Sequence, residues 1–481
     1  MEEMAHKYSS NYNTLILSKI SLTSSFHYYR IGIMKTYTFK GGIHPSEFKE
    51  LTQDKSIQYV IPSSKTVCIP ITQGGAPNEP LVAVGDSVAR GQKIAAGNSP
   101  MAVPVHASIA GTVKKIESRI VAGNTEVPCI IIQGDDSDRT EYLSVLDPFQ
   151  CSMEESLTRL KEAGIVGMGG AGFPTNVKYK IPAGKTAEYV VANASECEPY
   201  LTIDARLMEE ESSKFVDGLS IAMKITGAPK GIIVLESNKK HLVPILQKAV
   251  ENNIHGASIA IKLCKTKYPQ GSEKTIVKAV LKREIPTKGL PIDVGCVISN
   301  VATLCAISEA FREGKPLIDR PLTVSGQGCT EPKNLRVPVG TMVNEITDGT
   351  VSPETVKILS GGPMMGASMA DTNFPVEKRT SGITFLTAKE AALAEEDPCI
   401  GCGTCINHCP CNLSPVLMVR AMKADNYKEA QRYGLMDCIE CGACSYVCPS
   451  HVRLTQRFRV GKAVVRAELA KQKAASTGGK A

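Results

Sequence analysis

The chain has 481 residues, of which 43% are hydrophobic and 21% charged. This length predicts about three domains, each able to bury its own core, and this composition excludes a largely disordered chain. The longest apolar runs have the length of a buried strand and fall short of the roughly 18 apolar residues that a spanning helix needs, so no segment is expected to cross a membrane.

The formal net charge of +7 is concentrated at the carboxyl end. Residues 451–481 hold eight lysines and arginines and a single glutamate, whereas the preceding sequence is neutral overall. A neutral body argues against binding of nucleic acid. The basic tail, residues 461–481, is expected to be either solvated or docked on an acidic subunit or an anionic membrane leaflet.

The first 33 residues have neither a compact apolar stretch nor a small-residue cleavage site, so they do not resemble a secretory signal. They are predicted to form a poorly ordered leader, and a short arm or an extension from an early start codon are the alternatives. Met34 begins a much more regular sequence.

Residues 34–145 are predicted to form a small all-β domain, because short β-like runs alternate with Gly and Pro. The phrase beginning Val82-Ala83-Val84-Gly85-Asp86 resembles the barrel-sandwich fold of lipoyl and biotinyl carrier domains. Those carriers place a modifiable lysine in the turn where this chain has Asn98-Ser99-Pro100-Met101. Without that amine nothing can be acylated, so we expect a structural module and not a swinging arm.

The whole chain is predicted to be a multidomain α/β protein. Residues 150–316 alternate helical and strand patterns, which indicates a Rossmann-like α/β domain with a largely parallel sheet. Its expected strands are 189–192, 232–235 and 259–263, and its expected helices are 153–163, 215–225, 243–250, 273–281 and 301–311. Residues 320–375 are expected to form a small β-rich, β-grasp-like (SLBB-like) linker domain. Helices are then predicted over 388–396, 413–433 and 456–473.

The strongest motif is a pair of cysteine runs within residues 385–460. Eight of the 17 cysteines form two copies of Cys-x2-Cys-x2-Cys-x3-Cys-Pro, which is typical of two [4Fe–4S] clusters in an α-helical ferredoxin-type domain of a reducing cytosol. Three cysteines of a run can hold one cluster, whereas the fourth reaches the other cluster. The predicted ligands are Cys399, Cys402, Cys405 and Cys448 for cluster 1, and Cys438, Cys441, Cys444 and Cys409 for cluster 2.

Structural zinc is the alternative, but zinc sites pair one Cys-x2-Cys with a distant second half and have no use for two such runs. Gly401, Gly403 and Gly442 are expected to let backbone N–H groups approach the cluster sulfurs. Cys411 is a ninth cysteine in this region and has no place in the ligand scheme. The other eight cysteines are expected to be small buried hydrophobic residues.

A glycine-rich segment at 164–178 is the second motif, with glycines at 164, 167, 169, 170 and 172. Such a loop can bring backbone amides against a phosphate or a flavin ring, but alone it could equally be a structural turn, and it fits the dinucleotide fingerprint poorly. Three later segments follow in order: Asn193-Ala194-Ser195-Glu196-Cys197-Glu198-Pro199, Tyr268-Pro269-Gln270-Gly271-Ser272-Glu273-Lys274 and Ser299-Asn300-Val301-Ala302-Thr303-Leu304. Together the four segments resemble the flavin and NADH pocket of the 51-kDa subunit of respiratory complex I.

This resemblance implies non-covalently bound FMN and NAD(H) as a substrate. The implied FMN contacts are Gly167, Gly169, Gly170, Gly172, Lys178, Asn193, Glu196, Glu273, Asn300 and Thr303. Phe173 and Glu198 would face the nicotinamide nucleotide, and solvated loop charge is the alternative for the two glutamates 196 and 198. The chain departs from the complex I pattern at Ser195, where that pattern has an acid, and at Ser272, where it has a glutamate.

The layout from Lys35 to about Lys462, including the opening Thr38-Phe39-Lys40-Gly41-Gly42-Ile43-His44-Pro45, resembles the RnfC subunit of the Rnf complex, the ion-translocating ferredoxin:NAD oxidoreductase. The resemblance implies an electron-transfer subunit, held peripherally at the cytoplasmic face of the cell membrane by the other subunits of a membrane-embedded complex, with ferredoxin reached through a partner subunit. No acid/base residue is required. The alternatives are a flavin and iron–sulfur cobalamin reductase, and a scaffold relay whose flavin site has decayed.

Overall fold

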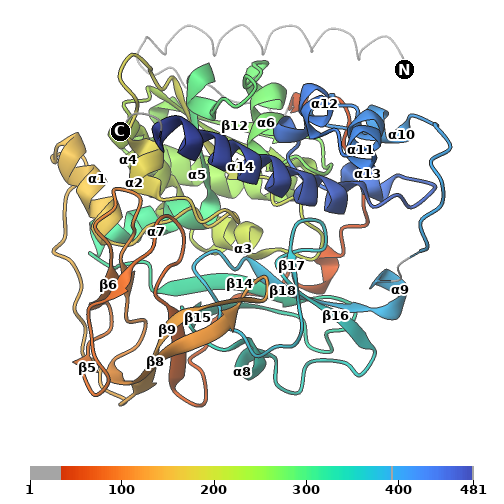
Figure 1. The fold of residues 1–481 in the computed structure, drawn as a ribbon. Coiled ribbons are helices and arrows are strands. Elements are labelled where there is room, and N and C mark those ends of the chain that lie inside the picture. Colours follow the sequence, from red (N-terminus) through yellow and green to blue (C-terminus); the bar gives the residue numbers. More distant parts are fainter. Residues whose placement is uncertain (1–33, 392–393, 479–481) are drawn as a thin grey trace, which may run out of the picture. The chain divides into compact units, whose positions relative to one another are not determined.

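A computed structural model describes residues 34–391 and 394–478, and the chain from Thr36 onward packs as one unit. The predicted leader, residues 1–33, lies outside the described residues. The described strands form four sheets, which are followed along the chain by a group of helices at the carboxyl end (Figure 1).

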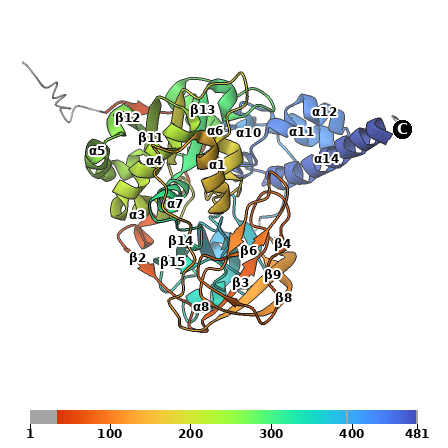
Figure 2. The same cartoon turned by 90° about the vertical axis from the view of Figure 1, so that its left-hand side faces the viewer.

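The barrel-sandwich module consists of two small antiparallel sheets. One has the order β3 (Thr66–Pro70), β9 (Thr125–Gly134), β8 (Gly111–Val121) and β5 (Ser87–Val88), and the other has the order β4 (Glu79–Pro80), β6 (Lys93–Ala96) and β7 (Val105–His106) (Figure 2). Apolar side chains that alternate along these strands, including Val67, Ile94 and Ile130, fill the space between the sheets.

The two strands before this module belong elsewhere. Strand β1 (Thr36–Tyr37) pairs with β12 of the α/β domain, and β2 (Ile57–Tyr59) pairs with β15 of the third domain. Both strands therefore find their hydrogen-bond partners in sheets outside the module, although they lie within the residues, 34–145, predicted for it.

The α/β domain has a parallel five-stranded sheet with the order β1, β12 (Ile259–Cys264), β11 (Lys230–Glu236), β10 (Tyr189–Ala194) and β13 (Cys296–Asn300). Its helices are α1 (Met153–Glu162), α2 (Thr175–Tyr179), α3 (Ile203–Glu210), α4 (Ser212–Thr226), α5 (Val243–Asn252), α6 (Glu273–Ile276) and α7 (Val301–Arg312). All eight predicted elements are confirmed, with a π-helical turn at Val277–Leu281 continuing α6. The strands are near-continuous apolar runs because both faces of a parallel sheet are buried.

The third domain is a six-stranded mixed sheet with the order β17 (Ala367–Met369), β16 (Thr355–Ser360), β18 (Gly382–Thr387), β14 (Asp319–Ser325), β15 (Lys333–Pro338) and β2. Helix α8 (Val343–Thr347) follows β15 along the chain. The sheet extends past the predicted limit of residue 375, because β18 pairs with both β14 and β16. The predicted helix 388–396 is wrong beyond α9 (Ala388–Ala391), since residues 394–400 are not helical and 392–393 lie outside the described residues.

The carboxyl-terminal domain contains α10 (Thr404–Asn407), α11 (Pro415–Lys423), α12 (Tyr427–Arg432), α13 (Ala443–Tyr446) and α14 (Leu454–Gly478). The predicted helical connector 413–433 consists of two helices, α11 and α12, because Asp425 takes a left-handed φ of 51° and the Asn426 side chain caps the second helix by accepting from Glu429 N. Met418, Phe458 and Val465 pack in the core of this domain. Within the described ranges, no helix combines the length and apolar character needed to cross a membrane.

Candidate cofactor sites

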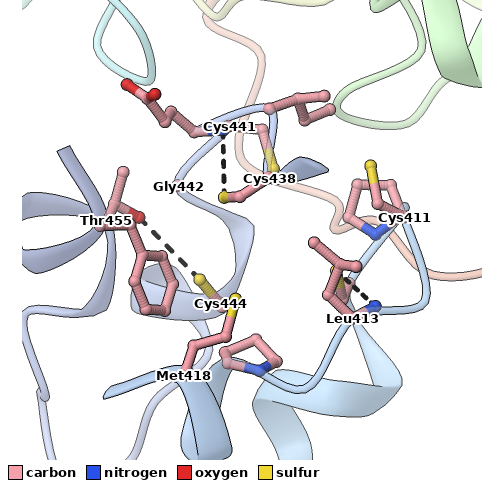
Figure 3. A pocket seen from close by; sticks show the side chains of 14 residues that line it. Cys411, Leu413, Met418, Cys438, Cys441, Gly442, Cys444 and Thr455 are labelled. Atoms are coloured by element: carbon pink, nitrogen blue, oxygen red, sulfur yellow. Dashed lines mark hydrogen bonds between the residues drawn. The ribbon is translucent and has the colours of Figure 1, made fainter. Parts of the chain in front are cut away.

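The two cysteine runs line two separate pockets in the carboxyl-terminal domain. The first pocket, called here the inner pocket, is lined by Cys409, Cys438, Cys441 and Cys444, together with Cys411 and apolar side chains from α11 and α14 (Figure 3). The second, called here the outer pocket, is lined by Cys399, Cys402, Cys405 and Cys448. The fourth cysteine of each run therefore lies with the first three of the other run, in the same two sets of four that the spacing predicts.

The walls of these pockets fit four-iron clusters. Backbone N–H groups of Leu413, Glu440 and Val452 lie 3.3, 3.4 and 3.4 Å from the Sγ atoms of Cys409, Cys438 and Cys448, an arrangement that stabilises negatively charged sulfur. Gly403 and Gly442 take left-handed φ values of 74° and 82° at the starts of α10 and α13. In the described part of the chain, no three His, Cys, Asp or Glu side chains are grouped as closely as a single metal ion requires.

The inner pocket is buried and adjoins the α/β domain. Cys441 and Cys444 are only 7% and 8% exposed, and burial raises the pKa of the Cys444 thiol to about 12. Gly42 N donates to His408 O at 2.9 Å, and the Lys274 ammonium donates to Asp437 O at 3.1 Å, so residues on both flanks of this pocket are bonded to the α/β domain or to the segment joined to it.

The outer pocket opens to solvent. Cys399 and Cys402 are exposed, and the intervening Ile400 is 71% exposed. The two pockets therefore follow each other from the α/β domain toward the protein surface.

The glycine-rich segment forms a closed loop between α1 and α2. Gly167 N donates to Phe173 O at 2.8 Å, and Gly172 N donates to Gly167 O at 3.2 Å. Gly170, at the tip, has a φ of 125°, and a Cβ added there would meet no described atom within 4 Å. The loop therefore presents bare backbone to open space, as a cradle for a phosphate or a flat ring requires.

Other predicted FMN contacts gather around this loop at the carboxyl edge of β10 and β13. Thr303 Oγ1 accepts from Met168 N at 2.9 Å, and Asn300 caps α7 within reach of Gly169. The Asn193 amide donates to Gly271 O at 2.8 Å. Lys178 and Glu273 form an ion pair of 2.7 Å. This edge of a parallel sheet is where ligands bind in open α/β folds.

The carboxylates of Glu196 and Glu198 accept hydrogen bonds from segments outside the glycine loop. The Glu196 carboxylate accepts from Asp204 N at 2.7 Å, at the start of α3. The Glu198 carboxylate accepts from Met364 N at 3.0 Å and Met365 N at 2.8 Å, in the turn between β16 and β17. Burial raises the pKa of both carboxyl groups to about 7. Phe173 is 43% exposed beside the glycine loop.

The sequence did not point to two buried cations near these residues, Lys49 and Arg320. Lys49 is buried and its ammonium donates to the carbonyl oxygens of Glu196, Glu198 and Leu201 at 2.8, 3.0 and 2.6 Å, while burial lowers its pKa. Arg320 on β14 is 1% exposed and donates from Nη2 to Met168 O at 3.1 Å. Arg320 lies beside another charged residue, Asp319, at the start of β14, so neither its own sequence context nor that of Lys49 marked it as buried.

Several buried polar atoms at this edge support the fit of a polar ligand. Arg320 Nη1, the Ser195 hydroxyl and both amide atoms of Gln270 have no hydrogen-bond partner among the described residues. Buried polar groups are normally paired, so such a group of atoms indicates that something polar completes the site.

Comparisons with known proteins agree with this arrangement. Residues 37–137 match the family described as the RnfC barrel sandwich hybrid domain, residues 160–309 match the Nuo51 FMN-binding domain, and residues 391–449 match the 4Fe-4S dicluster domain. The predicted barrel-sandwich, FMN-binding and dicluster domains are confirmed. Fold and sites together define an electron-transfer flavoprotein with iron–sulfur clusters.

Similar proteins of known name identify the family within this class of electron-transfer flavoproteins. The chain is 40% identical over 445 residues to the RnfC-type subunit of the proton-translocating ferredoxin:NAD(+) oxidoreductase complex of Clostridium ljungdahlii, and the match covers 91% of this chain and 96% of the relative. It is 39% identical to the corresponding subunit of the Na(+)-translocating complex of Acetobacterium woodii, covering 84% and 91%, and 39% identical to that of the ion-translocating oxidoreductase complex of Rhodobacter capsulatus, covering 89% and 83%. The chain belongs to this RnfC family, whose members are subunits of ion-translocating ferredoxin:NAD(+) oxidoreductase complexes.

Proposed function

We propose that this chain exchanges electrons between NAD(H) and its partner subunits in an ion-translocating ferredoxin:NAD oxidoreductase complex. The observation that carries the proposal is the inner four-cysteine pocket beside the α/β domain that holds the glycine loop. FMN supplies the conversion between a two-electron hydride carrier and one-electron carriers. Family membership does not favour a cobalamin reductase, and the open loop argues against a decayed flavin site.

The residues proposed to hold FMN are those predicted from the sequence: Gly167, Gly169, Gly170, Gly172, Lys178, Asn193, Glu196, Glu273, Asn300 and Thr303. The Glu196 carboxylate accepts from the first backbone N–H groups of α3, so its proposed role is to hold that end of α3 at the FMN site. Phe173 and Glu198 are proposed for the nicotinamide nucleotide. The inner and outer pockets are proposed to hold one [4Fe–4S] cluster each, with the eight thiols as ligands.

Partners and location follow from the same proposal. The exposed outer pocket is the proposed contact with an electron-carrying partner subunit, through which ferredoxin is reached. The chain would sit peripherally at the cytoplasmic face of the cell membrane. The six-stranded sheet with α8 is proposed to be the β-grasp-like linker domain.

One anaerobic purification tests the function. After reconstitution, the full chain should hold about eight iron atoms and eight acid-labile sulfides. Denaturation should release FMN, and addition of NADH should bleach the flavin and cluster absorption. Zinc as the only stoichiometric metal, or a protein without flavin, would contradict the proposal.

The change Glu198→Gln tests the nucleotide assignment. Each carboxylate oxygen of Glu198 accepts from one backbone N–H, that of Met364 or that of Met365. A glutamine has only one such oxygen, and its NH2 group would face the other N–H, where neither group can accept. We expect the KM for NADH to rise about fivefold, equivalent to about 1 kcal/mol, with FMN content unchanged. Glu154 on α1 is exposed, so Glu154→Gln serves as the control, and its KM for NADH in steady-state dye reduction should equal that of the unaltered chain. Equal loss of FMN in Glu198→Gln would place this residue in the flavin pocket instead.

The start of the basic tail and the turn of α14 before it are bonded to the cluster domain. Arg457 pairs with Glu396 at 2.7 Å, and Lys462 is 5% exposed, with its ammonium donating to Cys438 O at 2.5 Å and to Glu440 at 2.8 Å. Val465 is fully buried in the domain core. These contacts hold the first three turns of α14 against the cluster domain.

Truncation of the tail should therefore follow Ala467, so that this packing survives. The cut removes three lysines and one glutamate. We expect both clusters and NADH-dependent dye reduction to remain, while the protein leaves washed membranes at lower salt than the full chain, because exposed charges are screened within about 10 Å at 0.1 M salt. Release at the same salt concentration as the full chain would show that docking uses the folded domains.

A further inference from the structure

A turn of the barrel-sandwich module, residues 73–76, lies directly against the glycine loop. Gly74 has a φ of 98°, and a Cβ added there would lie 2.0 Å from the carbonyl oxygen of Gly172 and 2.9 Å from its carbonyl carbon. No side chain separates the two backbones at this point. A shift of the module at this point would therefore move the backbone of the glycine loop.

The next residue extends the same contact. A Cβ on Gly75 would lie 2.9 Å from Cγ of Pro174 on one side and 2.0 Å from Met101 O on the other. Ala76 N donates to Met101 O at 3.0 Å. Met101 belongs to the turn where a carrier domain would hold its modified lysine. In this chain, the turn at residues 98–101 instead supports the 73–76 turn, which contacts the glycine loop.

The other end of the glycine segment is tied to the module as well. The Gln73 side chain accepts from Lys378 N at 2.8 Å, and the Lys378 ammonium donates to Pro104 O at 3.1 Å and to Gly164 O at 2.8 Å. Lys378 is 1% exposed, and burial lowers its pKa to about 7. The module therefore contacts the glycine segment at its start, through Lys378, and at its end, through Gly74 and Gly75.

A loop with five glycines among nine residues, 164–172, has few side chains with which to hold its own shape. Glycine also loses more conformational freedom on ordering than any other residue, so an external support has a large effect on such a loop. The α/β domain supplies Thr303 on one side. The barrel-sandwich turn supplies a further contact at Gly172, and the space around a Cβ at Gly170 stays open.

We propose that the barrel-sandwich module is a positioning element of the flavin site, with its 73–76 turn holding the glycine loop in the shape that accepts FMN. The module has taken on this role in place of carrying an acyl group. This inference rests on the proposed function, in which the same loop binds FMN.

The test compares Gly74→Ala with Gly85→Ala in the full, cluster-reconstituted chain. Both glycines have a φ of 98°, which disfavours an alanine at either position, but a Cβ on Gly85 has no described neighbour within 4 Å. FMN is removed, and its dissociation constant is measured by fluorescence titration, with iron content as the measure of folding. We expect Gly74→Ala to weaken FMN binding at least about tenfold, and Gly85→Ala to stay within about twofold of the unaltered chain. Hydrogen exchange of residues 166–174 should become faster in Gly74→Ala alone.

Equal FMN affinity in the two variants, with iron retained, would overturn the inference while leaving the proposed function intact. Absence of FMN binding by the unaltered chain would overturn the proposed function itself. If Gly74→Ala does not fold, Gln73→Ala takes its place, because it removes the side chain that accepts from Lys378 N without adding an atom. Weaker FMN binding in Gln73→Ala with full iron content supports the inference, and unchanged binding overturns it.

Discussion

Replacement of Cys409 by alanine is expected to remove the cluster of the inner pocket and to leave the outer one in place. Cys409 belongs to the first cysteine run, yet it lines the pocket of Cys438, Cys441 and Cys444 from the second run. Three thiolates hold a cubane less well than four, and the buried pocket offers no solvent ligand. Iron content should fall from about eight to about four atoms per chain, with one of the two reduced-cluster signals lost from the electron paramagnetic resonance spectrum.

The adjacent Cys411 provides a matched control. It lines the same pocket, and burial raises the pKa of its thiol to about 12, but the spacing leaves it without a place among the ligands. Cys411→Ala should keep both clusters, and Cys448→Ala should lose only the outer one. If Cys409→Ala instead lost the cluster held by Cys399, Cys402 and Cys405, the crossed assignment would be wrong.

The sequence was most informative where chemistry depends on local spacing. The first three cysteines of each run are separated by only two residues and must lie close together, and the x3 gap with its proline marks the fourth as a ligand of the other cluster, so both groups could be predicted before the fold was known. Three strands and five helices of the α/β domain could also be predicted, because a buried parallel strand is a continuous apolar run, whereas β13 and the short helices α2 and α3 were missed. The glycine loop was recognised only together with three other segments, since glycines alone also suit an ordinary turn.

Features that depend on distant partners could not be read in this way. Strands β1 and β2 pair with strands more than 200 residues away, and strands of only two and three residues carry no recognisable pattern of their own. Lys49 looks like a solvated lysine until its three carbonyl partners, about 150 residues away, are known. The break at Asp425 depends on a left-handed residue and on the Asn426 cap, and the apolar spacing on either side is still helical. Glu198 was recognised as important, but its bonds to Met364 and Met365 come from another domain.

Insertion of a branched side chain at Gly170 is expected to abolish flavin binding and to spare the clusters. Gly170 has a φ of 125° at the tip of the loop, where a valine is strained and where its methyl groups would occupy the open space proposed for FMN. A strain of about 2–3 kcal/mol would by itself weaken FMN binding by a factor of about 30 to 160 if FMN selects the present loop shape.

The experiment compares Gly170→Val with Gly184→Val, in FMN content and in iron content. Gly184 has a φ of 79°, also in the left-handed range, and the described residues leave the space around an added Cβ empty there too. Gly184 lies outside the glycine loop, so we expect the backbone strain in Gly184→Val to leave its FMN content almost unchanged. We expect Gly170→Val to be purified without FMN but with about eight iron atoms, because the cysteine pockets lie in a different domain. Full flavin in Gly170→Val would mean that FMN is held elsewhere than on this loop, whereas loss of iron as well would mean that the substitution had disturbed the whole α/β domain and its contact with the inner pocket.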